Sequence, residues 1–427
     1  MNYRTIENLE FDKILNILLS YCSTYIGRAI CQNTKISFDI NEVEKRLKEV
    51  TQIQNCISKL GSLPITDIAN IDLSLKKTNI DGILSFKELL DVAHVLKISR
   101  EIKEYFFKET EYAQTLQYIY GYFDSLYTNI RIEQTIFDNI LDENTINDKA
   151  SNELYTIRKK IKQNENKIRD TLSSYISSPN FSQYLQDNII TMRNGRFVIP
   201  VKQEYKNMIK GLVHDMSSSG STLFIEPNNI VELNNNIKEL MIEENKEIEK
   251  ILYEYSKELS KISSNILDSV SNLGYIDFLN AKAKYSLDNN MYEPNINSSR
   301  YIRLVNARHP LIDNKIAVPI SLEISNNYNT MIITGPNTGG KTVTLKTVGL
   351  FALMSQSGLH LPTNENSELA VFENIYADGY FQQEFYKFRT VRKPYPKKQI
   401  NLMHFLGIQY FFRTDRRSYQ LDNNGYA

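Results

Sequence analysis

The sequence has no long apolar run and few cysteines. A helix that crosses a membrane needs about 20 consecutive apolar residues, and no segment of this chain approaches that length. Residues 1–7 lack the apolar core of a secretory signal. The three cysteines, Cys22, Cys31 and Cys56, are odd in number and lack a metal-type spacing, which favours buried free thiols in a reducing compartment. These absences predict a cytoplasmic protein with no membrane partner.

Net charge is also absent, because 50 Lys and Arg residues balance 50 Asp and Glu residues. No global positive field therefore indicates nucleic acid. The distribution is uneven, however: residues 379–427 hold nine basic and three acidic residues, a balance of +6, whereas residues 1–378 carry −6. That tail also holds 12 of the 46 Tyr and Phe residues. The length predicts about three domains at ~150 residues each, and the composition is typical of a globular protein.

The pattern of apolar residues predicts an α+β multidomain chain. Residues 1–150 read as a helical core, in which Leu9, Ile14 and Leu18 share one helical face. Residues 151–270 contain two long helices with near-heptad spacing, which favours an antiparallel coiled-coil pair. The apolar positions are Leu154, Ile157, Ile161, Ile168 and Leu172, with Asn164 among them, and then Leu233, Ile237, Leu240, Ile248, Ile251, Tyr255, Leu259, Ile262 and Ile266.

A small β module is expected between the two helices, at about residues 180–228. Two strand-like runs, Ile189–Met192 and Arg196–Val201, flank the turn signal Arg193-Asn194-Gly195. A third short strand is expected at Thr222–Ile225, after a Ser- and Gly-rich turn.

A glycine-rich loop carries the chemistry of the chain. The segment Gly335-Pro336-Asn337-Thr338-Gly339-Gly340-Lys341-Thr342 matches G-x-x-x-x-G-K-[ST] in full. An apolar strand at residues 331–334 precedes it, and a helix follows that stops near Gly358. Glycines let backbone N–H groups face phosphate oxygens, Lys341 reaches the β- and γ-phosphates, and Thr342 offers a hydroxyl to Mg²⁺. All eight residues are predicted to bind ATP, because a glycine-rich turn without this function would not require the flanking strand and helix.

The segment Thr334–Leu350 resembles the P-loop of the bacterial type-two MutS family. The likeness covers residues 1–378 in unbroken order. Further segments are similar to the family: Ala307–Leu311, Gly358–Pro362, Leu9–Ile14 and, in its clamp module, Arg193–Lys202 and Gly220–Pro227. The β module at residues 180–228 is accordingly called the clamp module, and residues 271–378 would begin a P-loop ATPase domain of the ABC and MutS type.

The resemblance implies a homodimer with helical lever arms, clamp tips and ATPase heads, in which each nucleotide lies between two subunits. It also implies suppression of homologous recombination through binding and nicking of branched DNA, and splitting of collided ribosomes through contacts with rRNA. In that family the endonuclease activity belongs to a C-terminal Smr domain. The sequence leaves DNA and the ribosome open as the main partner.

The match to the family stops after Asp378. The family continues with an apolar strand ending in Asp-Glu, which holds Mg²⁺ and polarises water, but no Asp-Glu pair follows the P-loop here. The pair Asp142-Glu143 lies far too early and is interpreted as a solvated helix end. We therefore assign no catalytic residue and expect hydrolysis near background. Residues 379–427 are a frameshift product, which other reading frames would reveal, or a basic nucleic-acid-binding tail, or a divergent domain.

Several weaker signals have ordinary structural explanations. Phe86-Lys87-Glu88 and Phe107-Lys108-Glu109 match the Phe-x-Glu motif of mismatch readers, but both fall in helical patterns. His309 is expected to pack in a core or loop rather than approach the nucleotide base, and His214-Asp215 lacks a nearby nucleophile. Mismatch recognition is therefore not expected.

The clamp module is rich in basic residues, which would bind phosphates of DNA or rRNA or form an ordinary solvated surface. They are Arg193, Arg196, Lys202, Lys206 and Lys210, against Glu204, Asp215 and Glu226. Two functions compete: an ATP-driven clamp on DNA or ribosomes, and a non-catalytic clamp fragment that binds nucleic acid. A chromosome-maintenance type of coiled-coil ATPase is disfavoured, because its P-loop precedes the coiled coil.

Overall fold

The computed structural model describes residues 3–313, 315–325, 330–333, 340–378, 385–390 and 401–404. Within these ranges the chain forms helices and three four-stranded sheets, which confirms the α+β class. Contacts divide it into two compact units. The head unit comprises residues 1–69, 97–128 and 265–427, and the arm unit comprises residues 70–96 and 129–264. The domains predicted from the sequence were continuous segments with boundaries at residues 150, 270 and 378, and these boundaries stay predictions.

Short helices and two long ones build the head unit. Thr24 caps α3 by accepting a hydrogen bond from the Gly27 amide, and Asp39 caps α4 by accepting one from the Asn41 amide. The helices are α1 (Tyr3–Asn8), α2 (Phe11–Tyr21), α3 (Tyr25–Gln32), α4 (Ile40–Leu60), α7 (Thr110–Thr115), α8 (Tyr120–Asp124), α13 (Ser263–Asp288) and α14 (Lys341–Gln356). Helix α6 (Phe86–Phe106) contributes its second half from Lys97, followed by a 3₁₀ turn at Phe107–Glu109.

Two sheets complete the head unit. The first has the order β5-β9-β6-β7, with β5 (Asn295–Asn297), β9 (Glu368–Ala370), β6 (Ile302–Ala307) and β7 (Ile320–Ile324). The second has the order β10-β11-β12-β8, with β10 (Phe372–Asp378), β11 (Phe385–Thr390), β12 (Asn401–His404) and β8 (Thr330–Ile332). Strand β12 runs parallel to β8, so part of the 379–427 segment pairs with the strand that leads into the P-loop. The predicted apolar face of Leu9, Ile14 and Leu18 is buried in the same core as α14.

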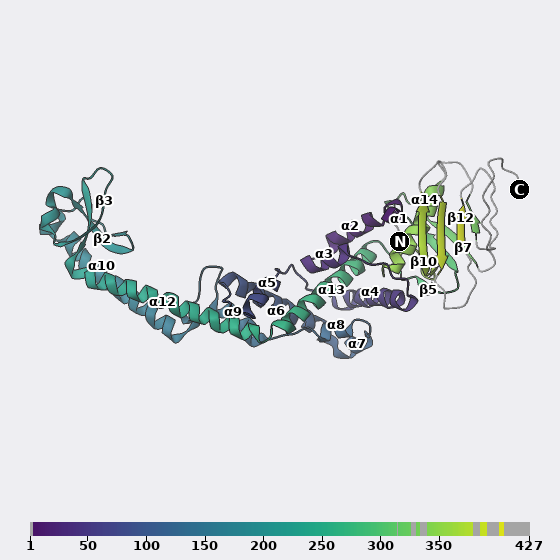
Figure 1. The fold of residues 1–427 in the computed structure, drawn as a ribbon, viewed down its shortest axis with the longest axis horizontal. Helices are drawn as coiled ribbons and strands as arrows, with labels where there is room; N and C mark the ends of the chain where they lie inside the picture. The colour runs from purple at the N-terminus through teal and green to yellow at the C-terminus, as the bar shows by residue number, and fades with distance from the viewer. Residues whose placement is uncertain are drawn as a thin grey trace. The chain divides into compact units, whose positions relative to one another are not determined.

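In the arm unit, α10 (Asn152–Ser177) and α12 (Asn228–Ser260) lie side by side (Figure 1). The Ser151 hydroxyl donates to Glu247 at 2.8 Å, and Arg158 Nε donates to Glu244 at 2.8 Å. Residue numbers thus rise along α10 while they fall along α12, which confirms the antiparallel pairing. Supercoiling stays a prediction. Helices α5 (Asp72–Thr78) and α9 (Ile130–Asn139) also belong to this unit.

The second long helix is shorter than the sequence pattern predicts. Its apolar spacing continues to Ile266, but α12 ends at Ser260 and α13 begins at Ser263. The Ile262 amide donates to the Leu259 carbonyl, three residues back, so the α-helical ladder is broken there. The hydroxyls of Ser260 and Ser263 both donate to Asn79 Oδ1. Serine side chains favour helix ends over helix interiors. The prediction used apolar spacing alone and therefore missed the helix end at these serines.

The small β module expected between the two long helices forms a sheet with the order β1-β2-β4-β3, and its role as a clamp stays a prediction. Its strands are β1 (Thr191–Arg193), β2 (Arg196–Lys202), β4 (Thr222–Pro227) and β3 (Gly211–Met216), with short helices at Pro179–Ser182 and Gln203–Met208. The expected hairpin turn is confirmed: Asn194 has φ 53° and Gly195 has φ 73°, as a two-residue turn with positive φ at both positions requires. Ile168 and Leu172 of α10 pack with Ile225 under this sheet.

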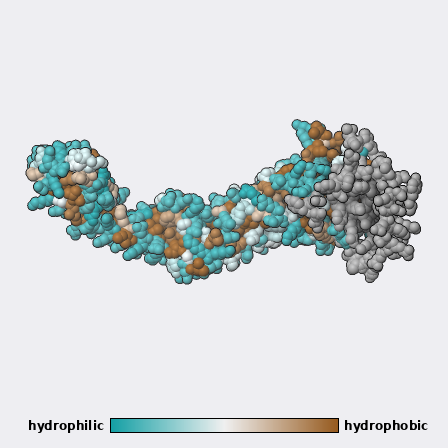
Figure 2. All heavy atoms as spheres, turned by 45° about the horizontal axis from the view of Figure 1, so that its top comes forward, coloured by the Kyte–Doolittle hydropathy of each residue, from teal (hydrophilic) through white to brown (hydrophobic). Residues whose placement is uncertain are grey.

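Hydrophobic residues on the face drawn in Figure 2 lie in separate patches among hydrophilic ones. None of the helices that the structure describes combines the length and apolar character that a membrane crossing requires.

Candidate functional site

The described part of the P-loop is its end, where the loop turns into helix α14. Gly340 is the N-cap, with φ 76° and ψ 9°. Among the described residues, a Cβ there would meet no heavy atom within 4 Å, so the left-handed backbone is the feature that favours glycine. The Thr344 amide donates to the Gly340 carbonyl at 2.9 Å, and the preceding first-turn amides have no acceptor within the helix. That end of α14 is therefore partly positive and suits an anion.

Only three of the eight predicted nucleotide ligands, Gly340, Lys341 and Thr342, are described. Gly335, Pro336, Asn337, Thr338 and Gly339 lie outside the described residues. Lys341 is 9% exposed, whereas Thr342 is exposed in the first turn of α14. The exposed hydroxyl of Thr342 is thus placed where it could be the one protein oxygen bound to Mg²⁺, as predicted from the sequence. The other ligands would have to be phosphate, water or carboxylate oxygens.

Helix α14 is held firmly by the head core. Phe351 and Leu353 are fully buried, and Gly349 lies so close to the turn between α1 and α2 that a Cβ would be 2.5 Å from Leu9 Cδ2. Glu10 follows Leu9 and forms an ion pair with Lys346 at 3.5 Å. The hydrogen bond from Lys13 lowers the pKa of Glu10, and the charge of Lys346 acts in the same direction. The N-terminal segment that resembles the family thus supports the P-loop helix.

Helix α14 ends near Gly358, as predicted. Gly358 has φ 72°, its amide donates to the Ser355 carbonyl, and the Leu359 amide donates to the Met354 carbonyl. This pair of bonds is the Schellman motif. A Cβ on Gly358 would also lie 2.5 Å from Arg46 Cβ on α4. Glycine is therefore required here by both the backbone angle and the close approach of α4.

No carboxylate from β12 accompanies the P-loop strand. Strand β12, parallel to β8, has the sequence Asn401-Leu402-Met403-His404, in which no residue is acidic. Within the described ranges, His, Cys, Asp and Glu form no group of three or more that would hold a metal ion. Asp142 and Glu143 lie exposed in a bend, where the Asn144 amide donates to Asp142 and Lys87 pairs with Glu143. They were predicted to be a solvated helix end: both are exposed, but they lie in a bend beyond the end of α9 at Asn139.

His309, Phe86 and Phe107, which were the weaker sequence signals, all make packing contacts. His309 is buried, its Nδ1 accepts from the Leu311 amide at 3.3 Å, and burial lowers its pKa. Phe86 packs beside the buried Ile251 of α12, and Phe107 makes an edge-on contact with Tyr120.

The clamp module presents fewer free cations than its sequence suggests. Arg196 turns inward, and its Nη1 donates to both oxygens of the fully buried Glu226 at 2.8 and 3.0 Å. His214 Nε2 lies 2.5 Å from the same carboxylate, so His214 has a structural partner. Arg193 pairs with Asp215 at 3.3 Å and lies over the Phe224 ring.

The remaining basic residues of the module stay at its surface. Lys206 and Lys210 are exposed, and Lys202 is half-buried with its amine on the Gln183 carbonyl. Lys202 also lines an open cavity of about 640 Å³ with Gln186, Gln203, Glu204 and Ser221. The phosphate-binding potential of the module therefore rests on these three lysines and on Arg193.

The sequence matches a family model and several curated proteins. Residues 331–379, from the P-loop strand through β10, match the family model for MutS domain V. Over 378 residues the chain is 43% identical to the Endonuclease MutS2 of Acetivibrio thermocellus and 44% identical to that of Ruminiclostridium cellulolyticum. It is 40% identical to the Endonuclease MutS2 of Clostridioides difficile over the same length. Each match covers 88% of this chain and 48% of the relative.

A P-loop helix inside a MutS domain V places the chain among the MutS-type proteins. The extended likeness to proteins named MutS2 goes further, and the chain belongs to the MutS2 family. It spans about half the length of the curated relatives that it matches.

Proposed function

We propose that this chain binds ATP with Mg²⁺ through Gly335–Thr342 and acts on nucleic acid through its clamp module. The observation that carries the first part is the complete P-loop motif running into helix α14, which begins directly after Gly340. Lys341 would contact the β- and γ-phosphates, and Thr342 would give its hydroxyl to Mg²⁺. The match to MutS domain V supports this assignment.

Binding of a fluorescent ATP analogue tests the site. Lys341→Ala removes the predicted phosphate contact, and we expect at least about a tenfold weaker affinity, since charge-assisted hydrogen bonds are strong. Lys346→Ala is the matched control, because Lys346 lies on the same helix and pairs with Glu10 instead. Equal affinity of the Lys341 variant and the wild-type protein would refute the proposal.

Hydrolysis is proposed to be near background in this polypeptide. Phosphoryl transfer depends on positioning and on stabilisation of charge, and β12 offers no carboxylate beside the P-loop strand. We assign no catalytic residue. Phosphate release at the rate of ordinary P-loop ATPases would contradict this part. The three explanations of residues 379–427 stay open, and translating the other reading frames of the coding DNA distinguishes the frameshift from the rest.

The proposed partners are branched DNA, the ribosome through its rRNA, or both, and the proposed assembly is a homodimer in the cytoplasm. The relatives' name, Endonuclease MutS2, supports a DNA-related role. Exposed Lys206 and Lys210 would bind phosphates, which makes affinity fall steeply with salt. Replacing both by Glu should weaken binding of a DNA junction or of ribosomes, whereas the same change at the exposed arm residues Lys159 and Lys160 should not. Molar mass in solution tests the dimer.

The alternative is a non-catalytic clamp fragment that binds nucleic acid without using ATP. The lack of an acidic residue on β12 favours it over a fully active ATPase. The two functions separate in one measurement: ATP should change the affinity for nucleic acid in the first and leave it unchanged in the second.

A further inference from the structure

We propose that Lys282 on helix α13 is a positioning residue for the nucleotide site at the far end of α14. It would hold the C-terminal end of α14 against α13, so that nucleotide binding and the packing of α13 are coupled. This inference rests on the proposed binding of ATP.

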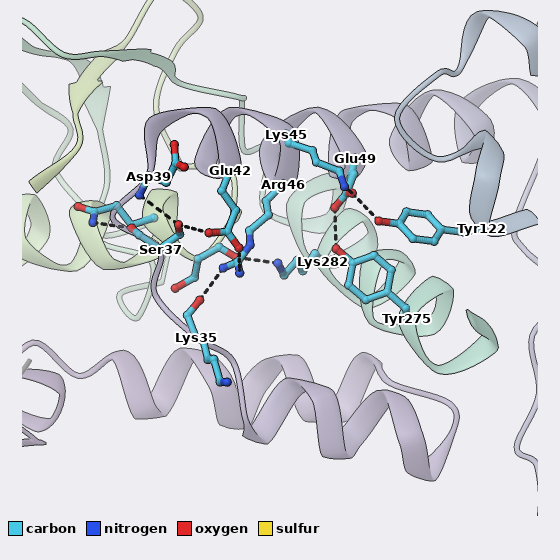
Figure 3. Close-up of polar contacts among 12 residues, drawn as sticks. Lys35, Ser37, Asp39, Glu42, Lys45, Arg46, Glu49, Tyr122, Tyr275 and Lys282 are labelled. Atoms are coloured by element: carbon cyan, nitrogen blue, oxygen red, sulfur yellow. Dashed lines mark hydrogen bonds and ion pairs between the residues drawn. The ribbon is translucent and has the colours of Figure 1, made fainter. Parts of the chain in front are cut away.

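Two residues of α13 anchor the chain just beyond α14. The Lys282 amine donates to the Ser357 carbonyl at 2.7 Å, and the Ser286 hydroxyl lies 3.0 Å from His360 Nδ1. Lys282 and Ser286 are four residues apart, so they share one face of α13. Figure 3 shows Lys282 among the polar contacts beneath α4, close to Arg46. A single face of α13 thus binds the segment that ends the P-loop helix.

The last residue of α14 is fixed from its other sides. Gln356 is fully buried, and its Nε2 donates to the carbonyls of Ser37 and Phe372 at 2.9 and 3.0 Å. Its Oε1 accepts from the Phe372 amide at 3.0 Å, and the Ser37 amide donates to its carbonyl at 2.9 Å. The residues before α4, strand β10 and helix α13 therefore meet at the end of α14.

A lysine is an unusual choice for such a buried anchor. Lys282 is 3% exposed, and its amine also lies 4.3 Å from the centroid of the Phe278 ring. Its pKa is lowered to about 7, chiefly by burial and also by the charge of Arg46, while Glu49 and Cys31 oppose the shift. Glu49 is itself bound by the hydroxyls of Tyr122 and Tyr275 (Figure 3). Burying an amine carries a large desolvation cost, which an apolar side chain would avoid, so the bond to Ser357 is the feature that distinguishes lysine here.

Other polar groups on this part of α13 do not share the anchoring. Asn280 is fully buried, and within the described chain neither atom of its side-chain amide has a hydrogen-bond partner. The same holds for the hydroxyl of Tyr285. The polar attachment of α13 to the end of α14 is thus concentrated in Lys282 and Ser286.

Helix α14 can transmit a displacement from one end to the other. It has 16 residues, or a length of about 24 Å, and nearly all positions from Leu345 to Gln356 are buried. A packed helix moves as a unit, so a shift at Ser357 is carried to Lys341 and Thr342. Coupling free energy is reciprocal, so bound nucleotide must in turn stabilise the contact of α13 with α14.

The test compares Lys282→Met with Lys284→Met, the same change at a half-buried lysine on the same helix. Hydrogen–deuterium exchange of the full chain is followed in α13 and α14, with and without ATP and Mg²⁺. Without nucleotide, Lys282→Met should speed exchange in the first turns of α14, far from the substitution. With nucleotide, wild-type protein should gain protection in α13, and Lys282→Met should lose that gain and bind ATP about fivefold more weakly or worse. Lys282→Gln keeps a donor and should restore most of both effects.

Faster exchange confined to residues near Lys282 and Ser357, with unchanged ATP affinity, would overturn the proposal. If the wild-type chain binds no ATP, the proposed function fails, while the nucleotide-free exchange of α14 still decides whether its two ends are coupled. If the Lys282→Met variant does not fold, Ser286→Ala removes the second anchor instead. Its hydrogen–deuterium exchange and ATP affinity are then judged by the same outcomes.

Discussion

Glu226 in the clamp module and Lys282 in the head unit are both buried charged side chains, but the two charges have different surroundings. Glu226 on β4 receives hydrogen bonds from Arg196, His214 and Asn234. Lys282 on α13 donates to a backbone carbonyl instead, and no carboxylate in the described ranges forms an ion pair with it. The effect of a buried charge on stability therefore depends on its hydrogen-bonding and ionic partners as well as on its burial.

A fully paired buried charge makes each of its partners indispensable, because removing one leaves an uncompensated charge in the interior. A buried amine without a counter-charge can lose its proton instead, so its cost depends on pH. The clamp module should therefore be sensitive to substitution at its charged cluster. The head unit should be sensitive to pH. Measurements of unfolding free energy test this distinction.

The largest effect is expected from Arg196→Met. This change leaves Glu226 buried without the guanidinium whose Nη1 donates to both of its oxygens, which should lower the free energy of unfolding of the arm unit by about 3–5 kcal/mol. Urea denaturation followed by circular dichroism would measure it. The double variant Arg196→Met, Glu226→Gln removes both charges and should recover much of the loss. A double variant as unstable as the single one would show that packing, not charge pairing, dominates.

The second effect is the pH dependence caused by Lys282. Its pKa falls from 10.5 in the unfolded chain to about 7 in the folded protein, so the unfolded state binds more protons between these values. Stability should therefore rise from pH 7 to pH 10.5 and be lost again as pH falls to 7. Across this range the change in unfolding free energy from this pKa shift is at most ~5 kcal/mol. The difference in unfolding free energy between wild type and Lys282→Met, measured across this range, isolates the contribution. A pH-independent difference would contradict it.

His360 predicts a separate acidic window. Burial lowers its pKa from 6.5 to about 4, opposed by the Leu47 carbonyl and Glu293 and assisted by Lys282 and Lys48. The unfolded state therefore binds more protons between pH 4 and 6.5, so stability should fall as pH drops through that window, by up to ~3 kcal/mol. In His360→Gln the fall should be smaller by that amount, as thermal unfolding at fixed pH values would show. An equal fall in both proteins would rule His360 out.

Local signals were enough to predict some features, and contacts between distant residues explain the rest. The hairpin at Asn194-Gly195 and the helix stop at Gly358 each depend on a backbone angle that the residue type itself favours. Arg196 and Glu226 are 30 residues apart and look like surface charges, because the strand pairing that brings them together is not encoded locally.

The role of Lys282 was also not predicted. The structure buries nearly every residue of α13 from Ile276 to Ser286, but Asp277, Asn280 and Lys284 recur there at helical spacing, so the sequence pattern does not indicate that burial. The acceptor of Lys282, Ser357, is 75 residues away in the sequence. The division into units has the same origin, since residues 97–128 join residues 265–427 through contacts that no linear pattern indicates.

The smallest effect is expected at the surface of the clamp module and serves as the counterpart to Arg196. Arg193 pairs with Asp215 at 3.3 Å, with both side chains more than a third exposed, so water and salt screen the pair. Arg193→Met should change the unfolding free energy by less than about 1 kcal/mol, while weakening nucleic-acid binding and reducing its salt dependence by about one phosphate contact. Urea denaturation and binding titrations at several salt concentrations measure the two effects. A loss of stability as large as that of Arg196→Met would erase the distinction between paired buried charges and screened surface ones.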